Sequence, residues 1–286
     1  MFDKISRSWS LAGQCWGVLK QDPALMIFPL LSSAALLALL GSFAVPVLLF
    51  FNDFDPRVTD GSTTHTSRLL FYIVMYAFYV LAYTVMMFFN SALIGVALKR
   101  LDGETAGVGE GLRMAWDNLP AILGYALIAA TVGTVLRAIE ERVGFIGRIV
   151  VALIGAGWTL ATAMTLPVLI EEDVGPVEAI SRSLELLKRN WGENLIGNSG
   201  ISLGIAVIAV PLMILAGCVA VTAFSSGSLG SIIVGGALFA VTLMVIGLVG
   251  STLHSIYTAA LYRFATGEKD NAGIDSTLLA GAYRTK

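Results

Sequence analysis

The chain has 286 residues, of which 56% are hydrophobic and 13% are charged, and its formal net charge is −2. A soluble domain typically carries about a quarter charged residues, so this composition excludes an ordinary soluble enzyme. The small negative net charge gives no global basic field, and a nucleic-acid partner is therefore not expected. The two cysteines, Cys15 and Cys218, form no CxxC or Cys/His cluster. Neither a disulfide framework nor a structural zinc site is expected within one chain.

Charged residues are absent from five long segments, which together make 167 residues. A bilayer core takes roughly 20 apolar residues per spanning helix, and the longest segment is long enough for two. Residues 225–231 interrupt that segment with the small polar and glycine residues of a turn. The sequence therefore predicts an all-α polytopic membrane protein, with one integral domain over 1–286 and six transmembrane helices. The predicted spans are 25–51, 69–98, 119–137, 149–170, 195–223 and 232–262.

Lysine and arginine residues are unevenly shared between the two sides of these spans. The two termini and the second and fourth connections carry 13 of them, whereas the other connections carry 5. Cytoplasmic segments are enriched in Lys and Arg, so both termini are predicted to be cytoplasmic.

Each odd-numbered span follows a segment whose apolar residues recur at helical spacing. Tryptophan with Lys and Arg on an amphipathic helix suits the headgroup layer, so these segments are predicted to be cytoplasmic interfacial helices. The same pattern also describes helices that pack under the other helices or dock a soluble partner. The predicted interfacial helices are 2–20, 106–118 and 177–191. The predicted interfacial anchors are Trp9, Trp16 and Trp191.

The three pairs of spans end in related ways, which predicts a threefold hairpin repeat. The aligned glycines are Gly103, Gly175 and Gly267. Thirteen residues before each glycine stand Asn90, Thr162 and His254. Ionisable and polar groups inside a span are costly and can indicate function, so these residues are a candidate intramembrane polar site at a common depth, with side chains predicted to face the bundle interior. The favoured interpretation is that these side chains only hydrogen-bond neighbouring helices.

Three prolines lie inside predicted spans and mark positions where a helix can bend, namely Pro46, Pro167 and Pro211. At the outer end of the third span, Arg137 and Glu141 are spaced to pair along one helix. No Walker A, GxSxG, HExxH or two-carboxylate constellation occurs within a plausible cytoplasmic domain. The sequence therefore predicts no catalytic residues, no metal and no cofactor.

Three segments carry a resemblance to known proteins. They are AATVGTVLRAIEERVGFIGRIV at 129–150, EEDVGPVEAISRSLELLKRNWGEN at 171–194, and DGE followed by EGLRMAW at 102–116. Together they resemble a family of bacterial six-pass inner-membrane proteins that is classified only as a domain of unknown function. The resemblance covers nearly the whole chain and implies a six-pass topology in a bacterial cytoplasmic membrane, but it supplies no site residues. A looser similarity is to the membrane domains that accompany glycerophosphodiester phosphodiesterases, whose catalytic portion is missing here.

These observations favour a non-enzymatic integral protein of the inner membrane that acts as an accessory, assembly or lipid-environment factor. The expected partners are membrane lipids and a further membrane protein or a second copy of the chain. The alternative is a small transporter or channel with a polar site near Asn90, Thr162 and His254. An intramembrane enzyme is less favoured, because a lone histidine without a carboxylate or nucleophile at its depth offers no acid and base pair.

Overall fold

A computed structural model describes residues 13, 15–20, 22–50, 65–189 and 191–267. Every regular element in this part of the chain is a helix, which confirms the predicted all-α class. Residues 13 and 15–20 are helical. The elements that follow are η1 (Pro23–Met26), α2 (Ile27–Phe50), α3 (His65–Leu101), α4 (Val108–Asp117), α5 (Leu119–Glu140), α6 (Phe145–Ala161), α7 (Thr165–Glu171), α8 (Pro176–Arg189), α9 (Trp191–Ser225) and α10 (Leu229–Thr266).

Within these described residues, five apolar helical segments are long enough to cross a membrane. The predicted span 195–223 lies within the continuous helix α9. The apolar stretch found in α9, Ala209–Ser225, is shorter than the five segments that are long enough to cross a membrane. Both α2 and α9 continue through the prolines predicted as bends, Pro46 and Pro211. The six-span topology therefore stays a prediction. The five segments are Pro23–Val45, Leu69–Leu101, Leu119–Glu140, Phe145–Glu171 and Leu229–Thr266.

The fourth predicted span, 149–170, lies within the apolar segment Phe145–Glu171, and its helix is interrupted just before the proline that was predicted as a bend. Helix α6 ends at Ala161, and α7 begins at Thr165. Proline has no backbone N–H, and its ring clashes with the carbonyl of the residue four positions earlier, so a regular helix does not pass through it unbent. Pro167 lies in the first turn of α7, where a missing donor costs least. The proline therefore ends one helix and starts another.

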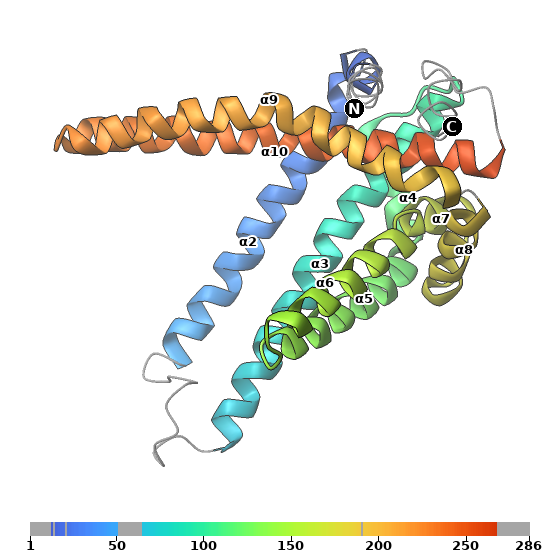
Figure 1. The fold of residues 1–286 in the computed structure, drawn as a ribbon, viewed down its shortest axis with the longest axis horizontal. Coiled ribbons are helices and arrows are strands. Elements are labelled where there is room, and N and C mark those ends of the chain that lie inside the picture. The colour runs from blue at the N-terminus through green and yellow to red at the C-terminus, as the bar shows by residue number, and fades with distance from the viewer. Residues whose placement is uncertain (1–12, 14, 21, 51–64, 190, 268–286) are drawn as a thin grey trace.

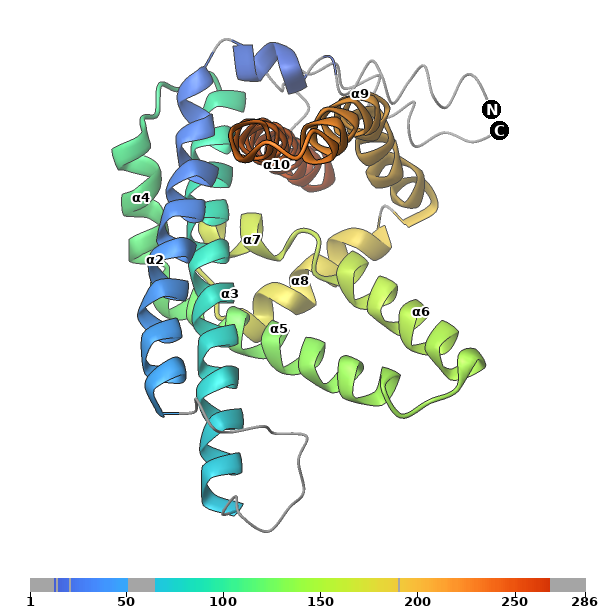
Figure 2. The same cartoon turned by 90° about the vertical axis from the view of Figure 1, so that its left-hand side faces the viewer.

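The long helices form three neighbouring pairs, α2 with α3, α5 with α6, and α9 with α10. Figure 1 shows the α9–α10 pair running across the ends of the other helices rather than alongside them. In Figure 2 the α5–α6 pair leans away from α2 and α3. The pairs meet at one end and diverge toward the other, so the helices expected to pack as one bundle do so only near that end.

The hydrophobic core lies where the three pairs meet. We call it the basal core and define it as η1, residues 91–101 of α3, helices α4, α7 and α8, the first half of α5, and residues 252–265 of α10. Away from this core the helix pairs expose most of their large apolar side chains. The largest fully buried side chains include Leu25, Phe28, Leu93, Leu98, Ile122, Met164, Leu169, Ile256 and Tyr257.

The segments 106–118 and 177–191, predicted as amphipathic lead-in helices, contain α4 and α8. Both turn one face toward protein: α4 contacts mainly α3, and α8 contacts mainly α7. Both helices thus pack on other helices of the chain, and their location at the membrane interface stays a prediction. Only the end of the segment 2–20 falls within the described residues, and it is helical there. The buried residues of the two helices are Gly111 and Ala115 in α4, and Ala179, Ser183, Leu186 and Leu187 in α8.

The helix ends that suggested a repeat differ in detail. Gly103 and Gly267 have left-handed φ angles of 80° and 92°, which glycine adopts without steric cost at a helix end. In the second pair this conformation belongs to Asp173, with φ 47°, and not to Gly175. The thirteen residues that separate Thr162 from its aligned glycine also cross the break between α6 and α7. A common depth for the three predicted polar residues therefore does not follow, and the threefold repeat stays a prediction.

Candidate functional site

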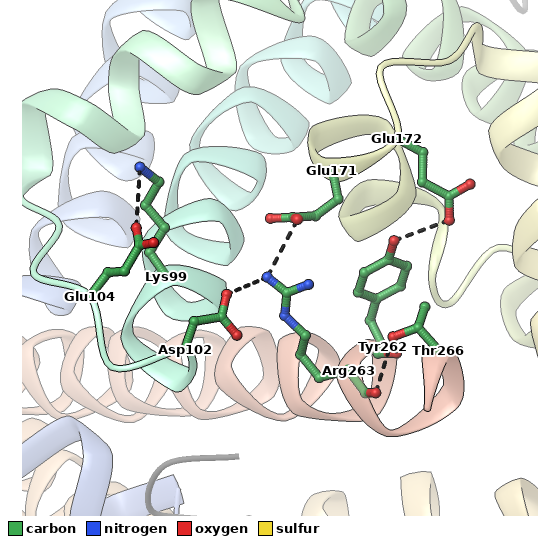
Figure 3. A network of polar contacts seen from close by, with 8 residues as sticks. All are labelled: Lys99, Asp102, Glu104, Glu171, Glu172, Tyr262, Arg263 and Thr266. Atoms are coloured by element: carbon green, nitrogen blue, oxygen red, sulfur yellow. Dashed lines mark hydrogen bonds and ion pairs between the residues drawn. The ribbon is translucent and has the colours of Figure 1, made fainter. Parts of the chain in front are cut away.

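The ends of α3, α7 and α10 meet at one charged residue, Arg263, in the last turn of α10. Its guanidinium contacts Asp102, which follows α3, and Glu171, the last residue of α7 (Figure 3). The distance from Arg263 Nη2 to Glu171 Oε2 is 3.4 Å, and the same nitrogen donates to Asp102 Oδ2. Only 11% of the Arg263 side chain is exposed. One cation thus holds the C-terminal ends of three helices, α3, α7 and α10.

The charges at this junction follow from helix electrostatics. The C-terminal end of a helix carries a partial negative charge, so a cation is favourable there and a carboxylate is not. Asp102 and Glu171 lie at two such ends and would repel each other without a cation between them. The guanidinium presents several donors in one plane and can bind two carboxylates at once. Arg263 is the first charged residue after the uncharged segment 194–262, and it offsets part of the negative charge at this junction.

A second set of polar contacts begins one residue earlier, at Tyr262. Its hydroxyl donates to Glu172 Oε1 at 3.0 Å (Figure 3). The other oxygen of Glu172 lies 3.3 Å from Arg182 Nε, and Arg182 Nη1 lies 2.9 Å from Glu185 Oε2. These contacts connect α10 to the end of α7 and to α8, so two consecutive residues of α10 fix its end against two other elements.

A third set of contacts attaches α4 and the segment before α2 to the end of α3. Lys99 Nζ donates to Glu110 Oε1 at 2.5 Å and lies 3.7 Å from Glu104 Oε2. Arg100 Nη2 lies 2.7 Å from Asp22 Oδ2. The hydrogen bond from Lys99 holds the pKa of Glu110 below its usual value of 4.5. These ion pairs fix the lead-in elements on α3.

The chemistry that this network supports is charge pairing at helix ends. The ionic side chains in it bind one another, and apart from the Arg182–Glu185 pair within α8 each contact joins separate segments of the chain. Within the described part of the chain, no three His, Cys, Asp or Glu side chains are grouped so that they could hold a metal ion. The network is therefore interpreted as a structural junction of helix ends in the basal core.

The structure does not bring the predicted polar site together as one buried cluster. Asn90 is half-buried on α3, directly before the buried Ser91. Thr162 is half-buried at the end of α6, and its hydroxyl donates to the Trp158 carbonyl at 2.9 Å. His254 is exposed on α10, which corrects the expectation that it faces an interior. The helices diverge instead of forming a closed bundle, and within the described part of the chain the His254 side chain is left uncovered.

The break beside Thr162 is bridged by Ser183, which sequence reasoning missed. The Ser183 hydroxyl donates to the Ala161 carbonyl at 2.7 Å and accepts from the Met164 amide at 3.1 Å. Ser183 is fully buried on α8. One side chain thus satisfies two backbone groups that the interrupted helix leaves without helical partners. The available signal was a serine on the apolar side of an amphipathic segment, combined with a proline inside a predicted span.

The predicted interfacial tryptophans are only partly described. Trp16 is 42% exposed, and the Lys20 ammonium lies 6.0 Å from its ring centroid, which is a cation–π contact. Trp9 lies outside the described residues. Trp191 begins α9, but the structure does not describe its side chain. Trp116 at the end of α4 was not predicted as an anchor, yet it is 66% exposed. Its position directly before an uncharged segment was the signal that could have identified it.

Comparison with known proteins gives one match. A family model described as a family of unknown function (DUF6159) matches residues 69–273. No curated protein and no solved structure matches the chain.

Proposed function

Since the chain belongs to this family, which has no assigned function, its role has to be argued from its own residues, and we propose that it is a non-enzymatic integral membrane protein. In this proposal it acts as an accessory, assembly or lipid-environment factor of the bacterial inner membrane. Its partners are membrane lipids, together with another membrane protein or a second copy of the chain, and nucleic acid is not among them.

The observation that carries the proposal is the apolar surface of the diverging helix pairs. Soluble monomers rarely expose contiguous apolar patches larger than a few hundred Å². Here large apolar side chains are exposed along all three pairs, and a lipid environment removes their contact with water. Examples are Leu37 and Leu40 of α2, Leu69 and Ile73 of α3, Ile146 and Leu153 of α6, Leu215 and Val221 of α9, and Leu229 and Val241 of α10.

The proposed topology has six spans with both termini in the cytoplasm, and it requires the α9–α10 pair, which runs across the other helices in Figure 1, to turn toward their direction in a bilayer. The excess of Lys and Arg on one side, 13 against 5, supports this orientation. The basal core then faces the cytoplasm, because Lys99 and Arg100 at the end of α3 belong to the Lys- and Arg-rich side. The Arg137–Glu141 pair, 3.4 Å apart at the end of α5, then lies at the outer surface.

A structural role without catalysis is supported by the way the polar groups are used. The ionic side chains around Arg263 and Arg182 contact one another, and they tie helix ends together. Catalysis needs an acid or base positioned toward a substrate, whereas these groups are positioned toward neighbouring helices. The exposed apolar area remains as the main surface through which the protein acts.

The alternative of a small transporter or channel has one observation in its favour. Transporters form binding sites at interrupted membrane helices, and the predicted fourth span is interrupted directly after Thr162. The backbone groups at this break are bound by Ser183, which favours a structural reading of the same feature. If the protein is a transporter, its binding site would be formed by Asn90, Thr162 and His254.

Reconstitution of the full chain into sealed vesicles separates the two readings. The accessory role predicts that the protein resists alkaline carbonate extraction and that vesicles with and without it hold a potassium gradient equally well. Loss of the protein into the carbonate supernatant would disprove membrane integration. Dissipation of the gradient, reversed by Thr162→Ala or His254→Ala in protein that still inserts, would instead establish the transporter.

A further inference from the structure

Helix α3 is too long for a bilayer, and its burial changes along its length. Its 37 residues make about 55 Å at 1.5 Å per residue, whereas the hydrocarbon core is about 30 Å thick. From Leu69 to Asn90 its side chains are exposed or half-buried, and from Ser91 to Leu98 every side chain is buried in the basal core. The helix therefore has a protein-covered part and a part open to its surroundings, and the change occurs at Ser91.

Trp116 lies at this same level. Its ring packs edge-on against Phe88, with 6.4 Å between ring centroids, two residues before Asn90. The indole is 66% exposed even though the rest of α4 is held against α3. Tryptophan is enriched where hydrocarbon meets the lipid headgroups, because its body is apolar and its N–H is polar.

Distances along two helices from this contact agree with the thickness of a bilayer. Along α3 from Phe88, the first charged residue is Arg68, twenty positions away, or about 30 Å. Helix α5 starts at Leu119, directly after the Trp116 region, and its first charged residue is Arg137, eighteen positions away, or about 27 Å. Both lengths are close to the thickness of a hydrocarbon core, about 30 Å, and neither exceeds it.

The surface on the other side of this contact is charged. Arg113 and Asp117 of α4 are exposed, and the Glu104 side chain before α4 is 63% exposed. Charged groups like these are costly inside hydrocarbon and are expected in water or among headgroups. The exposed surface thus changes from apolar to charged at the level of Trp116.

We infer that the hydrocarbon of the membrane ends at the level of Phe88 and Leu119, that Trp116 lies among the lipid headgroups there, and that α4 and residues 91–101 of α3 lie on the water side. This inference rests on the proposed membrane role and adds the position of the boundary. Asn90 then lies at the edge of the hydrocarbon, where an amide can reach water or headgroups. An intramembrane binding site is therefore not needed to explain a polar side chain at this position.

Depth-dependent quenching of tryptophan fluorescence tests this position in the full chain. The protein and its Trp116→Phe variant are reconstituted in phosphatidylcholine and phosphatidylglycerol vesicles whose acyl chains carry bromine either near the carboxyl end or in the middle. Phenylalanine keeps the aromatic contact with Phe88, so the variant is expected to fold, and equal helical circular dichroism verifies this. The difference between the two emission signals isolates Trp116.

The inference predicts that the Trp116 emission is quenched more by the shallow bromines than by the deep ones, and that this shallow component is lost in Trp116→Phe. Stronger quenching by deep bromines would place α4 inside the hydrocarbon and overturn the inference. Quenching by aqueous acrylamide with no effect of either bromine would place α4 away from the bilayer and also overturn it. In both cases retention in the membrane after carbonate extraction would leave the proposed function intact, whereas loss of the protein in that extraction would refute both.

Discussion

Replacement of Gly111 by alanine tests a close contact between α4 and α3 in the basal core. A β-carbon at Gly111 would lie 2.6 Å from Val96 Cγ2, 2.7 Å from the Ala92 carbonyl oxygen and 2.8 Å from Phe28 Cζ. The oxygen belongs to the backbone of α3 and cannot rotate away, so α4 would have to move. Overpacking of this kind costs about 1–3 kcal/mol. Alanine in place of glycine inside a helix contributes about 0.5–1 kcal/mol of stability, which offsets part of that loss.

Gly109 in the same helix provides a matched control, because a β-carbon there meets nothing within 4 Å. Gly109→Ala is therefore expected to keep or raise stability, whereas Gly111→Ala lowers it. The difference between the two variants isolates the clash, about 1–3 kcal/mol. Thermal unfolding of both proteins in one detergent, followed by circular dichroism, should give Gly111→Ala a Tm several degrees below that of Gly109→Ala. Equal Tm values would refute the close packing of α4 on α3.

Three further predictions concern the junction, the pH dependence and the lipid-facing surface. Arg263→Met should lower the free energy of unfolding by on the order of 2 kcal/mol, because hydrogen bonds to charged groups are lost and two carboxylates are left at helix ends. In the same unfolding assay, adding Asp102→Asn and Glu171→Gln should restore part of the lost stability. If these two changes restore none of it, the proposed junction is contradicted. The lysine partner lowers the pKa of Glu110 in the folded state, so the contribution of Glu110 to stability is present above its usual pKa of 4.5 and is lost as the pH falls through the lower folded value. Glu110→Gln should therefore flatten the acid side of a curve of Tm against pH. An unchanged curve would argue against the ion pair. Cys218 is exposed on an apolar part of α9, so in vesicles it should react with a membrane-permeant maleimide and not with a charged one; rapid labelling by the charged reagent would place α9 in water.

The helices themselves could be predicted because their signal is local. Charge-free segments set the approximate limits of α3, α5 and α10, and the turn at 225–231 correctly separated α9 from α10. The spacing of Arg137 and Glu141 likewise predicted their ion pair, since residues four apart share one face of a helix. In each case the interacting groups are close in the sequence, so no knowledge of the rest of the fold was needed.

The candidate site could not be predicted in the same way. Arg263 is separated from Asp102 by 161 positions and from Glu171 by 92, and no sequence spacing encodes that these helix ends meet. Ser183 bridges a helix break 19 and 22 positions away, and this role exists only because α8 packs against that break. His254 was placed in an interior because the spans were assumed to pack along their whole length.

The sequence by itself determined that the chain is helical and has the apolar segments of a membrane protein, because hydropathy and backbone preference are properties of short segments. Only the tertiary structure decided that the helix pairs diverge from a basal core, and that Arg263 joins the ends of α3, α7 and α10. The physical reason is that an apolar helix face is equally satisfied by lipid and by another apolar helix, so hydropathy does not reveal which of the two covers it. That choice depends on close contacts such as Gly111 against Ala92 and on charges that pair across distant parts of the chain, and these appear only when the helices are in place.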